Sequence, residues 1–110
     1  MAQKLTNYLR TYRKRACLTQ VEMAFLLGAA DGSKISHYEQ FGRVPVLPTA
    51  LAYEVIFRAR TDQLFAGLYE GVEHRVRERA GLLIRRLESK PLTPVSKHKL
   101  TALRSLISKD

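Results

Sequence analysis

The chain has 110 residues, a length that suits one small domain with an extension and leaves little room for a large catalytic cleft. Hydrophobic residues make up 45% and charged residues 26%, an ordinary globular balance that argues against disorder. Nineteen Lys and Arg residues against ten Asp and Glu residues give a formal net charge of +9, which favours a polyanionic partner.

The positive charge is spread along the chain. Nine basic and five acidic residues lie at or before Phe65, and ten basic and five acidic residues follow it. The charge therefore does not identify the part of the chain that would contact a partner. The alternative is a solvated basic surface that only maintains solubility.

The compartment is indicated by two features. A single cysteine, Cys17, excludes an internal disulfide and fits a reducing compartment. The longest apolar run, residues 23–30, is far shorter than the ~20 residues that cross a bilayer, and residues 1–15 contain no apolar signal core. We therefore expect a cytoplasmic protein without membrane insertion.

Two helices are predicted near the start of the chain. The first ends near Cys17 and is indicated by an apolar row at helical spacing. For the second, Gln20–Leu27, Thr19 and Glu22 form a T-x-x-E pattern that satisfies free amides at a helix start, and Gly28 suits a left-handed residue at its end. The apolar row of the first helix consists of Leu5, Leu9, Tyr12 and Ala16.

A third helix is predicted from an N-cap at Asp31 to about Gln40, because Gly42 and Pro45 mark its exit. Its spacing separates an inward face from a short, polar opposite face. The inward residues are Ile35 and Tyr38, and the polar face carries Ser33, Ser36, His37 and Gln40.

The rest of the chain also follows helical spacing, and no alternating strand pattern occurs, so the predicted fold class is all-α. A fourth helix runs from about Pro48 to Arg58, with Ala50, Tyr53 and Phe57 inward. Thr61 caps a short fifth turn that carries Leu64 and Phe65.

A long helix with one apolar stripe is predicted after Gly67 and continues through Glu88. Gly71 and Gly81 weaken the expectation that it is unbroken, and a last helix follows Pro94 and ends near Ile107. Glu73 and Arg77 stand four residues apart as an ion pair, within an otherwise solvated basic face. The stripe consists of Leu68, Val72, Val76, Ala80, Leu83 and Leu87.

The segment LRTYRKRACLTQVEMAFLLGAADGSKISHYEQFGRVP resembles the lambda-repressor-like, Cro/C1-type (XRE family) helix-turn-helix domain. The resemblance covers roughly Leu5–Phe65, and its residues occur in register without an insertion. It implies a five-helix DNA-binding domain at 1–66. The apolar stripe of the following residues predicts a C-terminal helical extension at 67–110 for dimerisation or partner binding. The carriers are Arg10, Arg13, Leu18, Thr19, Gln20, Ala24, Gly28, Ile35, Ser36, Tyr38, Glu39, Pro45 and residues 61–65.

The resemblance also implies how DNA would be bound. The third helix, residues 32–40, would lie in the major groove while the second helix rests on the phosphates. Glu39 would form an intradomain ion pair with Arg10 or Arg13. The implied base contacts are Ser33, Ser36 and His37, and the implied backbone or mixed contacts are Gln20, Gly32, Lys34, Gln40 and Arg43.

The chain departs from the family pattern at three places. Phe41 stands where the family usually has glycine, and Cys17 stands where it has a small turn residue. An apolar patch on the second helix replaces polar residues, and such a patch indicates a partner surface. Together with the long stripe it gives a predicted partner or dimer surface of Val21, Phe25, Leu26, Leu68, Val72, Val76, Leu83 and Leu87.

The predicted function is a sequence-specific DNA-binding regulator, a homodimeric repressor of double-stranded DNA sites. An enzyme is not expected, because His37, His74 and His98 lack metal-ligand spacing with the single cysteine and no phosphate loop is present, so no cofactor or metal is predicted. An antitoxin-type or other protein-binding adaptor that holds a partner through the C-terminal helices stays an alternative. RNA binding is a further alternative, without the usual aromatic platform.

Overall fold

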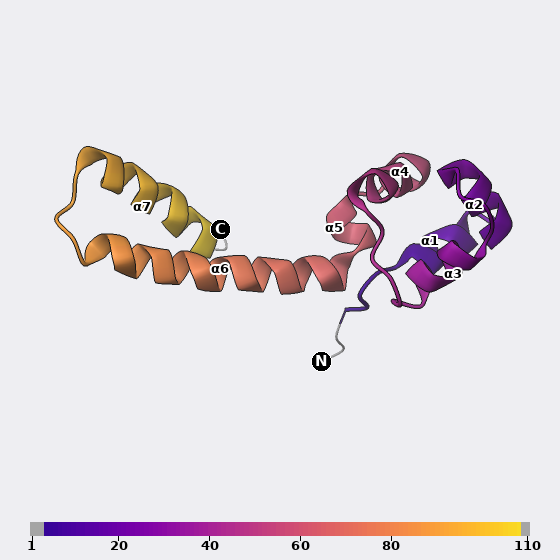
Figure 1. Cartoon of the computed structure of the whole chain (residues 1–110), viewed down its shortest axis with the longest axis horizontal. Coiled ribbons are helices and arrows are strands. Elements are labelled where there is room, and N and C mark those ends of the chain that lie inside the picture. Colours follow the sequence, from indigo (N-terminus) through magenta and orange to yellow (C-terminus); the bar gives the residue numbers. More distant parts are fainter. Residues whose placement is uncertain (1–3, 109–110) are drawn as a thin grey trace. The chain divides into compact units, whose positions relative to one another are not determined.

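The computed structural model describes residues 4–108, and these residues form seven helices and no strand (Figure 1). The prediction of an all-α chain is confirmed. No helix among the described residues is long and apolar enough to cross a membrane. The helices are α1 (Leu9–Arg15), α2 (Gln20–Leu27), α3 (Ser33–Glu39), α4 (Leu47–Phe57), α5 (Thr61–Leu64), α6 (Ala66–Glu88) and α7 (Pro94–Ile107).

The chain divides into two compact units, and the division falls inside α6 after Tyr69 rather than at residue 66. The backbone explains the difference. The amides of Gly67 and Leu68 donate to the carbonyls of Leu5 and Thr6 at 2.8 and 3.2 Å, so the start of α6 is fastened to the N-terminal segment. A Cβ at position 67 would overlap the Leu5 carbonyl, and therefore only glycine allows this close approach.

Helices α1 to α5 enclose the core of the first unit. Tyr53 lies at its centre with no exposed surface, and its ring meets that of Tyr38 edge-on at a centroid distance of 6.4 Å. Burial raises the pKa of the Tyr53 hydroxyl above its usual value. Of the residues predicted to point inward on α3 and α4, Ile35, Tyr38, Ala50 and Tyr53 are buried and Phe57 is partly buried. The core consists of Leu9, Met23, Ala24, Ile35, Tyr38, Ala50, Tyr53, Ala59, Leu64 and Phe65.

Helix α1 is shorter than predicted at both ends. It starts at Leu9 because the buried Asn7 side chain turns the chain there. Its Oδ1 accepts from the Leu9 amide at 3.1 Å, and its Nδ2 donates to the Tyr38 carbonyl at 2.9 Å. Leu5 and Ala16 lie outside the helix and are exposed, so the predicted apolar row is wrong at these two positions.

Helix α2 has the predicted bounds, and its start shows the predicted capping box. The Glu22 amide donates to the Thr19 hydroxyl at 3.0 Å, and the Thr19 amide donates to the Glu22 carboxylate at 2.8 Å. Two of the amides without an intrahelical partner are thus satisfied by side chains. The start of α2 is consequently fixed by local sequence alone.

Helices α1, α2 and α3 all end in the same way. The residues Cys17, Gly28 and Phe41 have positive φ angles of 59°, 73° and 67°. The amide of each of these residues donates to the carbonyl of the residue three positions earlier. The amide of the following residue donates to the carbonyl five positions before it. This pair of bonds closes a helix on a left-handed residue, and only one of the three is glycine.

The other helix ends are close to the predictions. Helix α4 begins one residue earlier than predicted, and Arg58 follows it as a left-handed cap. Thr61 is the first residue of α5 rather than its cap, and its hydroxyl donates to the Glu54 carboxylate at 2.6 Å. This bond joins α4 to α5.

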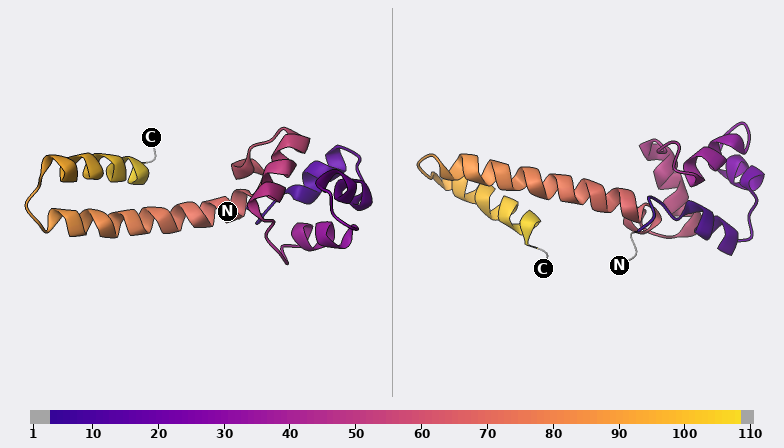
Figure 2. Two further views of the ribbon diagram at one scale, coloured as in Figure 1. Left: turned by 45° about the horizontal axis from the view of Figure 1, so that its top comes forward. Right: turned by 90° about the horizontal axis from the view of Figure 1, so that it is seen from below.

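The second unit is a hairpin of α6 and α7, and both views in Figure 2 show α7 beside the second half of α6. Helix α6 continues without a break through Gly71 and Gly81. Arg77 joins the two helices, because its Nε donates to the Leu106 carbonyl at 2.8 Å. It also forms the predicted ion pair with Glu73 at 3.1 Å.

Phe41 provides a direct test of how α3 ends. Phe41→Gly and Phe41→Ala both remove the aromatic ring, but only glycine also removes the cost of the positive φ. We therefore expect the Gly variant to be more stable than the Ala variant by about 1 kcal/mol. Urea unfolding of the two variants gives this difference directly. Equal stabilities would contradict the left-handed conformation at position 41.

Candidate nucleic-acid interface

A buried ion pair holds α3 against α1. Arg13 Nε donates to Glu39 Oε2 at 2.6 Å and Arg13 Nη2 donates to Glu39 Oε1 at 3.1 Å, while the two side chains are only 10% and 3% exposed. The hydrogen bond to Glu39 raises the pKa of the guanidinium above its usual value, so the group stays charged. Two parallel bonds of this kind fix orientation as well as distance.

The same pair also reaches the start of α2. Arg13 Nη1 donates to the Leu18 carbonyl at 2.9 Å, just before α2, and Gln20 Nε2 donates to Glu39 Oε1 at 3.2 Å. Three helices are thereby joined through the side chains of Arg13, Gln20 and Glu39. Of the two predicted ion-pair candidates, Arg13 is the one that pairs with Glu39. Arg10 is exposed and forms no ion pair with a described residue.

Gln20 lies at the start of α2 as predicted, and its side chain forms a hydrogen bond within the protein. Its side-chain amide points to Glu39 and is partly buried, so this N–H is engaged inside the protein. Gly32 lies close by, because a Cβ there would stand 3.4 Å from the Gln20 Cβ. The close approach that Gly32 permits is therefore to the start of α2 within the protein itself.

The start of α3 differs from the prediction by one residue. Gly32 occupies the N-cap position, and Asp31 lies before it. The Asp31 carboxylate accepts from both the Ser33 hydroxyl, at 2.6 Å, and the Ser33 amide, at 2.9 Å. These two bonds hold the pKa of Asp31 below its usual range. A carboxylate therefore stands at the leading end of α3.

The outer face of α3 has the predicted polar character. Ser33, His37 and Gln40 are exposed and Ser36 is partly exposed, whereas Ile35 lies in the core. Lys34 on α3 and Arg43 in the following loop are also exposed and supply positive charge beside this row. The face thus offers hydroxyl, imidazole and amide groups to a partner, with cationic side chains beside them.

The loop after α3 keeps the shape that glycine would give it. Phe41 adopts the left-handed conformation, and Gly42 donates its amide to the His37 carbonyl at 2.9 Å. Gln40 is the C-cap of α3 and directly precedes this turn. The cost of a positive φ at a residue with a side chain is therefore borne at Phe41 itself.

Two helices of the first unit carry apolar side chains on their outer surface. Val21, Phe25 and Leu26 on α2 are exposed, Phe25 by 84%. Helix α4 packs against α2 and adds a row that the sequence reasoning missed, at a spacing of four residues. The sequence of α4 could have indicated this row, because a helix with apolar residues on all sides is normally buried and one at the surface leaves some of them exposed. The added row is Leu47, Leu51 and Val55.

The predicted partner stripe on α6 does not form one face. Leu68 packs against the core of the first unit, and Ala80 is buried in the hairpin. Val72, Val76 and Leu83 are exposed, while Leu87 is only partly so. The stripe therefore divides into residues that pack inside one of the two units and residues that remain exposed to solvent.

No group of His, Cys, Asp and Glu among residues 4–108 has the arrangement of a metal site. Cys17, the third departure from the family pattern, is exposed and serves as the left-handed residue after α1. Comparison of the chain with family models, curated proteins and solved structures found no match.

The buried pair gives a sharp prediction for stability. Arg13→Met leaves an unpaired buried carboxylate and Glu39→Leu leaves an unpaired buried guanidinium, so each is expected to destabilise the protein by about 3 kcal/mol. The double variant leaves neither charge and should be much less destabilised than the two losses combined. Urea unfolding at neutral pH measures all three. Single losses below about 1 kcal/mol, or full additivity, would contradict the structural role of the pair.

Proposed function

We propose that the protein is a sequence-specific DNA-binding regulator of the lambda-repressor-like helix-turn-helix type, acting in the cytoplasm as a homodimeric repressor. The observation that carries the proposal is the combination of α2 and α3 with the buried Arg13–Glu39 pair. It holds a short helix with a polar outer face in a fixed orientation. A net charge of +9 favours DNA as the polyanion. Repression itself is inferred from the family resemblance.

In this proposal α3 enters the major groove. His37 and Ser36 reach base edges, because they lie on the outer face while Ile35 anchors the helix from behind. Ser33 acts as an acceptor, since its hydroxyl proton is donated to Asp31. A serine held this way suits a base donor. Asp31 is then a further candidate, because a carboxylate accepts from the cytosine amino group.

The phosphates are bound by different groups. The Gln20 side chain donates to Glu39, so the donors proposed at α2 are the backbone amides of Gln20 and Val21, which the capping box does not satisfy. Lys34 and Arg43 add side-chain contacts to the backbone on the α3 side. Gln40 stands between these groups and takes a mixed role. Gly32 then keeps the start of α3 close to α2.

The test compares the chain's own upstream DNA with random DNA over a salt series. His37→Ala is expected to weaken binding to the specific site by about 1–3 kcal/mol and to relax one base preference. His98→Ala, an exposed histidine on α7, is the matched control and should bind normally. Fluorescence anisotropy and footprinting provide the readouts. An unchanged footprint and affinity for His37→Ala would contradict base contact by this residue.

Homodimerisation is proposed because two half-sites are needed for useful affinity and specificity. The surface proposed for the second copy is the apolar outer face of α2 and α4. No Lys or Arg occurs in residues 16–33 or 44–57, so this face escapes the repulsion expected from 19 basic residues elsewhere. In a two-fold interface the same apolar face of each copy would meet the other.

The dimer is tested by sedimentation at several protein concentrations. Phe25→Asp or Val55→Asp places like charges in the proposed interface, and each should weaken self-association at least about tenfold. Val95→Asp, an exposed valine on α7, is the matched control and should not alter it. A wild-type chain that is monomeric at high concentration, both alone and on DNA, would contradict the dimer.

A protein-binding adaptor is the second candidate function. The observation in its favour is the second unit, in which only Ala80 and Leu100 are buried among the described residues after Tyr69. A hairpin with so little core leaves apolar side chains exposed for a partner. DNA binding and partner binding can coexist, because they use different units of the chain.

A further inference from the structure

Helix α6 carries two rows of side chains, each with the alternating three- and four-residue spacing of a helix–helix seam. The inner row faces α7 and is at least partly buried. The outer row is exposed, and part of it lines a groove beside α7. The inner row is Glu73, Arg77, Ala80, Ile84 and Leu87, and the outer row is Val72, Val76, Arg79, Leu83 and Arg86.

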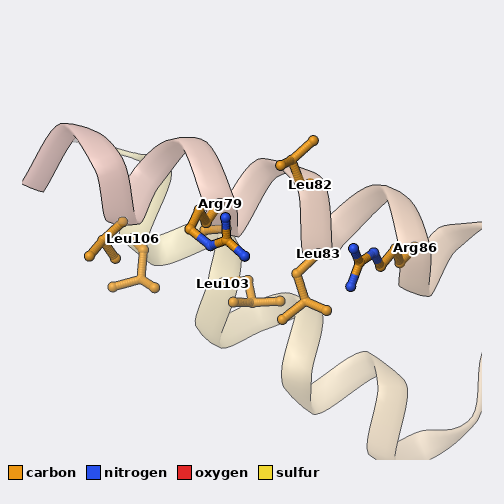
Figure 3. Close-up of a pocket in the computed structure, with 8 residues that line it drawn as sticks. Arg79, Leu82, Leu83, Arg86, Leu103 and Leu106 are labelled. Atoms are coloured by element: carbon orange, nitrogen blue, oxygen red, sulfur yellow. The ribbon is translucent and has the colours of Figure 1, made fainter.

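The outer row borders a groove between α6 and α7 with a volume of about 290 Å³ (Figure 3). Figure 3 shows Leu83 of α6 and Leu103 of α7 between the two helices, with Arg79 and Arg86 on either side of Leu83. Leu106 and Val76 continue the apolar lining. The groove is therefore an apolar strip that carries two cationic groups along one helix.

The two groove arginines, Arg79 and Arg86, differ in their ion pairing from the two arginines that connect α6 with α7. Arg77 and Arg104 are paired with Glu73 and Glu88. Arg79 and Arg86 form no ion pair with any described residue. They are seven residues apart, which places them on one side of the helix at a separation of about 10 Å.

We propose that this groove binds an acidic amphipathic helix of another protein. Its apolar side chains would fill the strip along Leu83 and Leu103, and two carboxylates two turns apart would pair with Arg79 and Arg86. A helix is the occupant that fits, because the outer row has the period of a helix seam and α7 already occupies the parallel inner row. The proposal concerns the second unit only and does not depend on DNA binding.

Charge argues against a second copy as the occupant. The outer row of a second hairpin would bring the same Arg79 and Arg86 and no carboxylate. Like charges would then face one another across an apolar strip, which costs several kcal/mol. With an acidic helix in the groove, the interaction of its carboxylates with Arg79 and Arg86 would be attractive instead. The groove is also at the lower limit of small-molecule pockets, which are about 300–1,000 Å³, so it suits a row of side chains better than a compact ligand.

The experiment uses the full chain and three labelled synthetic helical peptides of equal length. The first has a leucine seam flanked by glutamates seven residues apart. The second has the same composition with the glutamates moved to the opposite face, and the third has lysines in their place. Fluorescence anisotropy is expected to show the first peptide binding at least about tenfold more tightly than either of the others.

Two protein variants locate the binding. Arg79→Glu/Arg86→Glu should lose the preference for the first peptide and gain one for the lysine peptide. Arg85→Glu/Lys97→Glu makes the same charge change at exposed positions outside the groove and should keep the wild-type preference. Circular dichroism verifies that both variants remain helical. The exchanged preference also requires a folded groove.

Three outcomes would overturn the proposal. The first is equal binding of all three peptides, and the second is an equal loss of binding in both variants, which indicates bulk charge alone. The third is self-association of the wild-type chain that Leu83→Asp abolishes, which assigns the groove to a second copy. DNA binding by the same variants is measured in parallel, so a failure of the regulator proposal is seen separately.

Discussion

The Arg13–Glu39 pair is the interaction on which the arrangement of the first unit depends. Glu39 is the last residue of α3, and its carboxylate accepts bonds from α1 and from Gln20 of α2. Arg13 in turn donates to the Leu18 carbonyl before α2. Because a buried charge without its partner is costly, both side chains are held in one geometry, and the orientation of α3 is fixed with them. The outer face of α3 thereby becomes a rigid surface.

The proposed recognition of a duplex needs a rigid and exposed α3, and the short turns of the first unit also favour rigidity. Left-handed residues close α1, α2 and α3 in short turns, even where Cys17 and Phe41 stand in place of glycine. The C-terminal hairpin is built differently, because little of it is buried and its open side carries Arg79 and Arg86. One unit is thus suited to present a face to DNA, and the other to receive a partner.

Much of the fold was predictable because its signals are local. The capping box at Thr19 and the glycine at 28 gave both bounds of α2, and periodicity gave the order of the helices. The start of α1 was missed because it depends on Asn7 reaching the distant Tyr38 carbonyl. Tertiary contacts of that kind leave no periodic signal in the sequence.

The candidate site shows the same division. The polar outer face of α3 follows from spacing alone, but the engagement of the Gln20 amide by Glu39 does not. Likewise the stripe on α6 has a helical period that fits one face in the sequence, whereas Leu68 and Ala80 are used inside different units. Which apolar residues remain exposed depends on the contacts between helices. The helical spacing of the sequence does not predict those contacts.

The central claim is that α3 reads a DNA sequence, and selection from a pool of random duplexes tests it most directly. At physiological salt, where non-specific binding is weakened, the wild-type chain should enrich one motif with two related half-sites. Replacing Ser36 and His37 together should change the enriched bases within each half-site and leave the half-site spacing unaltered. Recovery of no motif, or of the same motif with both residues replaced, would contradict the account.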